Sequence, residues 1–241
     1  MKTYGLIGKT LKHSFSKDYF SSFFIKENIE ASYENIEIED IDKITEVFRK
    51  EYSGLNVTIP YKVAILPFLD DLSEEAQRIG AVNVVSFEDN KLIGYNTDAY
   101  GFHQSIKPFL SNKHERAIIF GTGGASKAIE FILKNLGIDV IFISRNPSGE
   151  NQFSYADINE NMVNACKLLV NCTPIGMYPN SDACIELPFE CLTAEHLVVD
   201  LIYNPSKSLF LHKAEKSGAM ILNGESMLKH QALKAWEIWN K

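Results

Sequence analysis

The segment Ala117-Ile118-Ile119-Phe120-Gly121-Thr122-Gly123-Gly124-Ala125-Ser126 decides the fold class of this chain. Its apolar start predicts a strand, and the residues after it have the apolar spacing of a helix. Gly121 permits a tight turn, and Gly123 lets a pyrophosphate approach the backbone where a helix N-terminus favours anions. Ser126 replaces the third glycine of the dinucleotide fingerprint. Glycines often only mark turns, but this strand–turn–helix context predicts a nucleotide site.

The next expected strand, residues 140–143, indicates which nucleotide is bound. It ends in Ser144-Arg145-Asn146, and no carboxylate follows before Glu150. A site for NAD usually has an acidic residue here, about 20 residues after the glycines, to hold the ribose 2′-hydroxyl. A guanidinium instead suits a 2′-phosphate, and the flanking Ser144 and Asn146 can add hydrogen bonds. The segment favours NADP over NAD, with an exposed arginine of no special role as the alternative.

The rest of the chain alternates short apolar runs with helical patterns, which is typical of an α/β fold. A turn at Asp89-Asn90 predicts a hairpin, and so an antiparallel element in the first sheet. We therefore expect an N-terminal α/β domain with a mixed, mainly parallel sheet, followed by a Rossmann-like domain. The expected strands are 3–7, 33–38, 54–58, 81–87, 92–95, 117–120, 140–143, 168–170 and 197–201, and the expected helices are 16–28, 41–52, 99–109, 125–136 and 225–239.

Composition argues against several classes of partner. The 241 residues carry a net charge of -7, and the lysines and arginines are scattered, which disfavours nucleic acid and anionic membranes. No apolar stretch approaches the ~18 residues that a membrane helix needs. The cysteines and histidines lack metal-ligand spacing, so we expect no metal site and four free, mostly buried thiols, as in a cytoplasmic protein.

Polar side chains follow several expected strands, at the edge where open α/β sheets bind ligands. Ser14 and Ser16 follow the first strand, where they can hold a carboxylate, cap the next helix, or do both. Lys62 begins a helix after the third strand and can donate a proton to a forming alkoxide, although many such lysines are merely solvated. Asp98 either stabilises a helix N-terminus or pairs with Lys62, and spacing alone leaves both alternatives open.

Taken together and in order, motifs along nearly the whole chain resemble the shikimate dehydrogenase family. The most specific are N-V-T-x-P-x-K and N-T-D-x-x-G. The matching segments are 14–16, 54–62 (GLNVTIPYK), 80–83 (GAVN), 96–101 (NTDAYG), 121–125 (GTGGA), 171–177 (NCTPIGM), 200–205 (DLIYNP), 223–224, 227–228 and 231–232.

The resemblance implies roles that the residues alone do not assign. Lys62 would be the catalytic acid/base with Asp98 beside it, and Ser14, Ser16 and Tyr203 would hold the substrate carboxylate. Ring hydroxyls or nearby polar groups would be bound by Thr58, Lys62, Asn83, Asp98 and Gln231. The cofactor NADP(H) would be contacted by Gly121, Thr122, Gly123, Gly124, Ala125, Ser144, Arg145, Asn146, Leu201, Gly224 and Glu74.

The resemblance also implies domain limits and a reaction. A substrate-binding catalytic domain would span 1–101, completed by 224–241, and a Rossmann-like NADP-binding domain would span 102–223. The enzyme would be an NADP-dependent oxidoreductase that reversibly reduces 3-dehydroshikimate to shikimate in the chorismate pathway of aromatic amino acid biosynthesis. It would act on a small molecule as a monomer or homodimer. The alternatives are a quinate/shikimate dehydrogenase of broader specificity and a non-catalytic NADP-binding module, which would need neither Lys62 nor Asp98.

Overall fold

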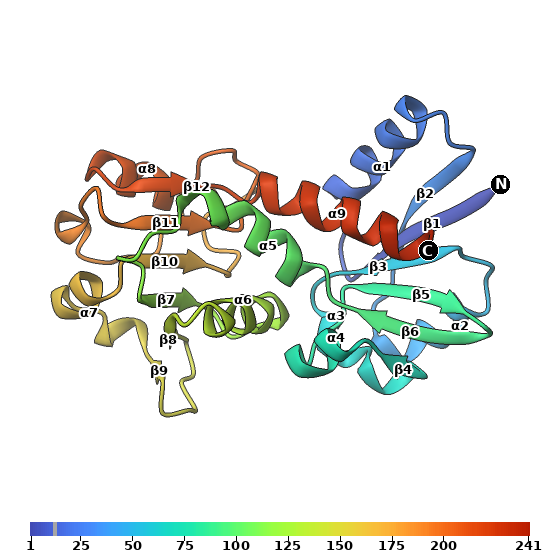
Figure 1. The fold of residues 1–241 in the computed structure, drawn as a ribbon, viewed down its shortest axis with the longest axis horizontal. Coiled ribbons are helices and arrows are strands. Elements are labelled where there is room, and N and C mark those ends of the chain that lie inside the picture. The colour runs from blue at the N-terminus through green and yellow to red at the C-terminus, as the bar shows by residue number, and fades with distance from the viewer. Residues whose placement is uncertain (12–13) are drawn as a thin grey trace. The chain divides into compact units, whose positions relative to one another are not determined.

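The computed structural model describes residues 1–11 and 14–241 and divides them into two compact units (Figure 1). The first unit joins Met1–Tyr100 to Gln231–Lys241, and the second is Gly101–His230. Both divisions fall inside helices, whereas the sequence analysis placed the limits at 101/102 and 223/224. Among the described residues, no helix is both long and apolar enough to span a membrane.

The sheet of the first unit is mixed, as predicted. Its order is β2-β1-β3-β5-β6-β4, in which β1 pairs in parallel with β2 and β3, and β5 pairs antiparallel with β3 and β6. The β5–β6 turn has left-handed φ values of 49° at Asp89 and 62° at Asn90, which confirms the hairpin. The strands are β1 (Lys2–Gly8), β2 (Ala31–Glu37), β3 (Gly54–Val57), β4 (Asp71–Leu72), β5 (Val84–Glu88) and β6 (Lys91–Tyr95).

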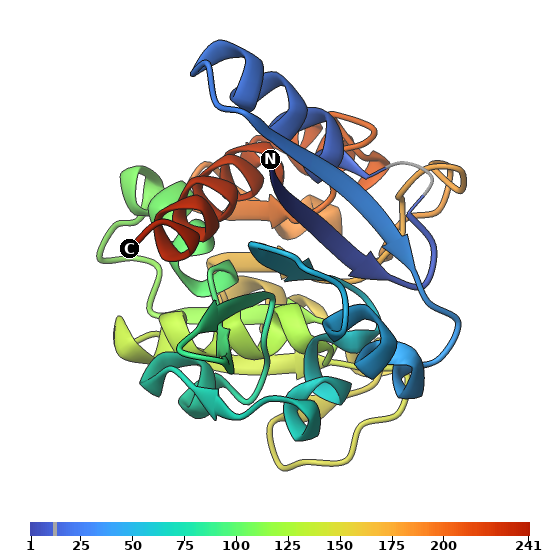
Figure 2. The same cartoon turned by 90° about the vertical axis from the view of Figure 1, so that its right-hand side faces the viewer.

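Helices cover both faces of this first sheet (Figure 1). On one face α1 and α9 lie side by side, and Figure 2 shows them from a second direction as the blue and red helices. Their core contains Tyr4, Phe20, Tyr33 and Trp239, and the indole of Trp239 donates to the carbonyl of Val85 at 3.1 Å. The other face carries shorter helices. The helices of this unit are α1 (Phe15–Lys26), η1 (Ile41–Lys43), α2 (Ile44–Phe48), α3 (Tyr61–Ala64), η2 (Leu66–Phe68) and α4 (Glu74–Ile79), with parts of α5 (Asp98–Ile106) and α9 (Glu225–Trp239).

The second unit contains the expected parallel sheet. Its order is β12-β11-β10-β7-β8-β9, and every pair of neighbours runs in parallel. Apart from the exposed Arg116 at the start of β7, the residues of β7, β10 and β11 are buried, as the apolar sequence predicted. The strands are β7 (Arg116–Phe120), β8 (Asp139–Ile143), β9 (Gln152–Phe153), β10 (Leu168–Asn171), β11 (Leu197–Asp200) and β12 (Met220–Leu222).

The glycine-rich turn connects the end of β7 to the start of α6, and so lies at the carboxyl edge of this sheet. Helix α6 begins directly after the turn and packs on β7 and β8, while α7 and α8 contribute Val163 and Phe210 to the core with Phe120 and Val198. The helices and helical turns are η3 (Lys107–Phe109), α6 (Gly124–Asn135), η4 (Tyr155–Asp157), α7 (Glu160–Ala165), η5 (Phe189–Cys191) and α8 (Leu209–Lys216), with the remaining parts of α5 and α9.

Some expected elements differ from the structure. The helix predicted over 41–52 is a 3₁₀ turn followed by α2, which ends at Phe48 because the chain must turn toward the start of β3 at Gly54. The strand expected from residue 81 starts only at Val84. The four cysteines form no disulfide with one another, but Cys166 alone among them is buried, so the expectation of mostly buried thiols was wrong.

Candidate active site and nucleotide site

The structure brings Lys62 and Asp98 of the first unit together. Lys62 lies on α3, just after β3, and Asp98 is the first residue of α5. The ammonium Nζ of Lys62 donates to Oδ2 of Asp98 at 2.6 Å. The Asp98 side chain is 1% exposed and that of Lys62 is 15% exposed, so the ion pair is buried on the carboxylate side and reaches solvent at the amine. Sequence spacing left open whether Asp98 pairs with Lys62, and the structure shows that it does.

Asn83 links this ion pair to two further polar residues. Its amide Nδ2 donates to Oδ1 of Asp98 and to Oγ1 of Thr97, both at 3.1 Å, and to Oε1 of Gln231 at 3.3 Å. Its Oδ1 accepts the backbone N–H of Thr97 at 2.7 Å. Because every polar atom of the Asn83 amide is engaged, the carboxylate of Asp98 has a fixed orientation, and its other oxygen faces Lys62.

A second group of polar residues lies between α1 and the first sheet. The phenol of Tyr33 donates to Oδ1 of Asn56 at 2.7 Å and also hydrogen-bonds the side chain of Ser16. Burial raises the pKa of Tyr33, so the phenol remains a neutral donor. Asn56 in turn donates to the carbonyl of Asn83 at 3.2 Å. This chain of hydrogen bonds connects Ser16 to the segment that carries Asn83.

Ser14 occupies the N-cap position of α1, but its side chain makes no capping hydrogen bond. Its hydroxyl oxygen is buried and has no hydrogen-bond partner in the part of the chain that the structure describes. Burying an unpaired hydroxyl is costly, so the position suits a hydroxyl that donates its hydrogen to an added ligand. The side chain of Ser14 therefore does not cap α1, although the sequence allowed that role.

Two other predicted site residues of the first unit have simpler surroundings. The backbone N–H of Thr58 donates to the carbonyl of Ile7 at 2.9 Å, which places its half-buried side chain at the ends of β1 and β3. Glu74 is exposed at the first position of α4, after the capping residue Ser73. No contact joins Glu74 to the Lys62–Asp98 pair among the contacts of the described residues.

The glycine-rich turn of the second unit has the geometry that the sequence predicted. Gly121 has a φ of +97°, which a side chain would strain, and its N–H donates to the carbonyl of Ile143 at 2.8 Å. Gly123 is the N-cap residue of α6 and brings no side chain to compete for the free N–H groups of the first turn. Ser126, in place of the third glycine, is 1% exposed, so this position needs a small residue for close packing.

The residues after β8 form a short polar turn beside the glycines. The hydroxyl of Ser144 accepts the N–H of Asn146 at 3.3 Å, which shapes the backbone around Arg145. Arg145 is exposed. Burial raises the pKa of Tyr155, and the positive charge of Arg145 opposes that rise, so the guanidinium lies within electrostatic range of this phenol. The turn thus presents an exposed cation with hydrogen-bonding neighbours, and β8 ends in no carboxylate.

Leu201 and Gly224, far apart in the sequence, are in close contact. A Cβ built on Gly224 would lie 2.0 Å from the carbonyl oxygen of Leu201, and the N–H of Gly224 donates to the carbonyl of Ile202 at 3.1 Å. Glycine is therefore required where the segment before α9 passes the end of β11. Tyr203 follows in the same loop and is half-buried.

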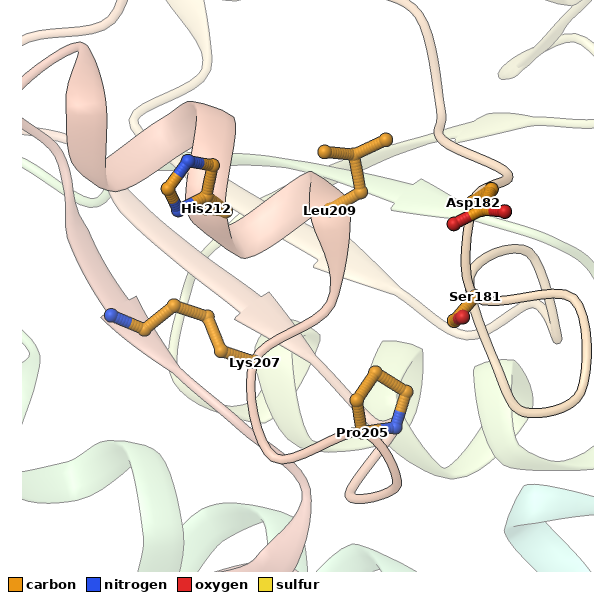
Figure 3. Close-up of a pocket in the computed structure, with 6 residues that line it drawn as sticks. All are labelled: Ser181, Asp182, Pro205, Lys207, Leu209 and His212. Carbon is orange, nitrogen blue, oxygen red and sulfur yellow. The ribbon is translucent and has the colours of Figure 1, made fainter.

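A shallow hollow of about 340 Å³ lies elsewhere on the second unit (Figure 3). No residue that the sequence predicts as a ligand lines it, and its lysine is paired with Glu215 at 2.7 Å. Within the described residues, no cluster of histidine, cysteine or acidic side chains is arranged to hold a metal ion. The hollow is lined by Ser181, Asp182, Pro205, Lys207, Leu209 and His212.

Sequence reasoning assigned no role to several residues of these networks. The sequence analysis treated Asn56 only as one residue of the N-V-T motif. It treated Tyr33 only as part of a strand with alternating polarity. Asn171 and Asp200 end β10 and β11, and both are fully buried. A polar residue at the end of an apolar strand is a signal that could have identified the last two, since polar groups are rarely buried without a partner.

Known proteins share the sequence and the architecture of this chain. Residues 6–85 match the model of the shikimate dehydrogenase substrate binding domain. A shikimate dehydrogenase (NADP(+)) of Clostridium botulinum is 38% identical over 99% of this chain and 96% of its own length. The crystal structure of a Thermus thermophilus shikimate 5-dehydrogenase in complex with NADP(H) and shikimate is 32% identical, with a TM-score of 0.86 over 99% of this chain and 93% of that chain.

A protein with a different activity has nearly the same fold. A 5-ketofructose reductase of a Gluconobacter strain is 28% identical, with a TM-score of 0.85 over 99% of this chain and 92% of that chain. The fold therefore accommodates more than one substrate, so the substrate has to be assigned from the residues of the site and not from the fold alone. With curated relatives that are 35% and 38% identical over nearly the whole chain, and with the same two-sheet architecture, this chain belongs to the shikimate dehydrogenase family.

Proposed function

We propose that this protein is an NADP-dependent shikimate dehydrogenase, which reversibly reduces 3-dehydroshikimate to shikimate in aromatic amino acid biosynthesis. The observation that carries the proposal is the Lys62–Asp98 ion pair, fixed by Asn83 at the ends of β3 and β5. A module that only bound a nucleotide would have no use for an oriented amine beside a buried carboxylate. The family membership of the whole chain supports the same activity.

Lys62 acts as the proton donor in the reductive direction and as the acceptor in the reverse direction. Reduction of a ring ketone leaves negative charge on its oxygen, and a positioned ammonium both stabilises that charge and delivers a proton. The bond to Asp98 holds the ammonium in place. Asn83, Asp98 and Gln231 present hydrogen-bonding atoms within one network, which suits a ring with several hydroxyls, and Thr58 adds a hydroxyl at the ends of the neighbouring strands β1 and β3.

Ser14 and Ser16 supply the hydroxyls for the substrate carboxylate, and the family resemblance assigns Tyr203 to the same group. Ser16 is oriented through Tyr33 and Asn56, whereas the Ser14 hydroxyl is buried with no partner among the described residues. A carboxylate would accept hydrogen bonds from both hydroxyls and so give the Ser14 hydroxyl a partner.

Replacing Ser14 with alanine should raise the KM for shikimate about tenfold, with a smaller effect on kcat, because a hydrogen bond to a charged group is lost. The variant should keep the thermal midpoint of the wild type, since the Ser14 hydroxyl makes no hydrogen bond in the described protein. Steady-state kinetics and a melting curve measure both quantities. Ser22→Ala, on the exposed side of the same helix, is the control, and an unchanged KM in Ser14→Ala would remove Ser14 from the site.

The second unit fits NADP(H), which supplies the hydride when it is bound. The glycine turn leaves the backbone of Gly121–Gly124 and the start of α6 open to a pyrophosphate, with Thr122 and Ala125 beside it. The polar turn of Ser144, Arg145 and Asn146 suits a ribose 2′-phosphate. Leu201 and Gly224 are assigned to the other half of the cofactor. Glu74, in the first unit, is retained as a cofactor ligand on the strength of the family resemblance alone.

Replacing Arg145 with glutamine should raise the KM for NADP about tenfold to a hundredfold and leave the KM for NAD nearly unchanged, because only NADP carries the 2′-phosphate that a guanidinium binds. Initial rates with each cofactor measure the shift. Arg49→Gln removes another exposed guanidinium, in the first unit, and should change neither value. An Arg145→Gln variant with wild-type preference for NADP would show that another group binds the 2′-phosphate.

The proposal is tested by incubating purified protein with NADPH and 3-dehydroshikimate and identifying the product by mass spectrometry. We expect shikimate in an amount equal to the NADPH consumed. NADPH oxidation with 5-ketofructose but not with 3-dehydroshikimate would reject the proposal, and so would binding of NADPH without turnover of either ketone. We further propose that the enzyme works in the cytoplasm as a monomer or homodimer, which gel filtration can distinguish.

A further inference from the structure

A buried carboxylate in the second unit remains without a role in the proposed reaction. Asp200 is the last residue of β11, and Asn171 is its partner in register at the end of β10. Both side chains are fully buried. Nδ2 of Asn171 donates to Oδ1 of Asp200 at 2.9 Å. Together with Thr173 and Ser208, these residues form what we call the Asp200 network.

The Asp200 network fixes the loop that follows β11. Oδ1 of Asp200 also accepts the N–H of Ile202 at 3.0 Å, and Oδ2 accepts the hydroxyl of Ser208. Ser208 is buried and caps α8, where its hydroxyl accepts the N–H of Leu211 at 3.4 Å. The segment from Leu201 to the start of α8 is therefore tied at both ends to one carboxylate.

The same network fixes the loop that follows β10. Oδ1 of Asn171 accepts the N–H of Thr173 at 2.9 Å and its hydroxyl at 2.7 Å. Nδ2 of Asn171 donates to the carbonyl of Ile175 at 3.3 Å in addition to Asp200. One hydrogen-bonded pair of side chains thus shapes both loops at the carboxyl edge of β10 and β11.

Stability of the fold does not by itself explain an acid at this position. Burial raises the pKa of Asp200 to about 6, although hydrogen bonds from Ser208, Ile202 and Asn171 oppose the rise. A buried charged group usually stabilises a protein less than a well-packed apolar side chain of similar size. A carboxylate with this set of donors does, however, hold a backbone in a single arrangement, because each of its oxygens accepts from a different segment.

The place of these loops in the sheet indicates what that arrangement serves. The glycine turn follows β7, and the turn with Arg145 follows β8 on one side of it, whereas β10 and β11 lie on the other side. A dinucleotide crosses the carboxyl edge of such a sheet with its halves on either side of the glycine turn. With the 2′-phosphate at Arg145, the nicotinamide half falls to the ends of β10 and β11, where Gly224 packs on the carbonyl of Leu201.

We propose that Asp200 is a positioning residue: its hydrogen bonds to Asn171, Ser208 and the backbone of Ile202 hold the loops after β10 and β11 in the shape that receives the nicotinamide half of the cofactor. The proposal rests on the proposed NADP-dependent function. It assigns Asp200 no contact with cofactor or substrate. Thr173 of the network lies close to Gly121, whereas the turn of residues 144–146, proposed for the 2′-phosphate, lies on the other side of β7.

Two ligands that share the adenosine half separate this role from a general structural one. NADP⁺ carries both halves, and adenosine 2′,5′-bisphosphate carries only the 2′-phosphorylated adenosine. Asp200→Asn keeps the size of the side chain and removes its charge and one acceptor. We expect the variant to bind NADP⁺ about tenfold more weakly, as measured by calorimetry, and adenosine 2′,5′-bisphosphate within about twofold of the wild type. Ser208→Ala should show the same pattern with a smaller loss.

Ser105→Ala is the matched control, since it removes another buried serine hydroxyl of the second unit, which bonds the carbonyl of Phe102, and it should change neither affinity. Equal weakening of both ligands by Asp200→Asn would make the network merely structural and overturn the proposal. Unchanged binding of both ligands in Asp200→Asn and Ser208→Ala would overturn it as well. Wild-type protein that bound neither ligand would instead refute the proposed function, and this proposal with it.

Discussion

Replacing Lys62 with alanine should lower kcat about a thousandfold and change the KM for shikimate only a few-fold, because general acid–base catalysis contributes about 10²- to 10⁴-fold. The ammonium is the cation that the structure places against Asp98, and its loss removes both the proton and the charge that meets the developing alkoxide. Steady-state rates in both directions measure the effect.

Two controls make that result specific to the chemistry. Removing the lysine leaves Asp98 buried with Asn83 as its remaining side-chain donor among the described residues, so the melting temperature has to show that the variant is folded at the assay temperature. Lys134→Ala removes an exposed lysine from an ion pair with Glu130 and should leave kcat unchanged. A Lys62→Ala enzyme with kcat within twofold of the wild type would exclude Lys62 from proton transfer.

The second large effect is expected from Gly224→Ala, which should weaken NADP⁺ binding tenfold or more. The added Cβ would lie 2.0 Å from the carbonyl oxygen of Leu201, so one of the two backbone segments has to move. Overpacking of this kind typically costs about 1–3 kcal/mol. Calorimetric titration with NADP⁺ measures the loss.

Gly137→Ala separates lost affinity from lost stability. Gly137 has a φ of +76° and open space around it, so an alanine there strains the backbone without touching Leu201. This variant should melt earlier than the wild type but bind NADP⁺ normally. If Gly224→Ala bound NADP⁺ as tightly as Gly137→Ala, the contact between Gly224 and Leu201 would have no part in the cofactor site.

The sequence best predicted the elements that depend only on neighbouring residues, such as turns and the starts of helices. The run from Ala117 to Ser126 contains its own strand, turn and helix start, and the structure forms them as β7 and α6. The hairpin at Asp89-Asn90 is equally local, because both residues tolerate a positive φ. The helices α4, α7 and α8 were missed because they are too short for a periodic pattern, although Ser73, Asn159 and Ser208 cap them and were a usable signal.

The arrangement of the candidate site could not be predicted from local signals. Asn83 and Gln231 are hydrogen-bonded although 148 positions separate them, and the Lys62–Asp98 pair joins two helices that follow different strands. The resemblance to a known family named these residues without placing them. Tyr33 and Asp200 escaped notice for a physical reason: they act by holding other groups, so their chemistry is visible only when their partners are known.

The most direct test of the central claim is the rate of cofactor reduction by the wild-type protein with NADP or NAD and with shikimate or quinate. We expect the pair of NADP and shikimate to have the highest kcat/KM of the four combinations. The preference for NADP follows from the exposed Arg145 and from the absence of a carboxylate at the end of β8. The preference for shikimate follows from the hydrogen-bonding network around Asn83. No turnover in any combination would contradict the account, and a higher kcat/KM for NAD or for quinate would contradict its assignment of cofactor or substrate.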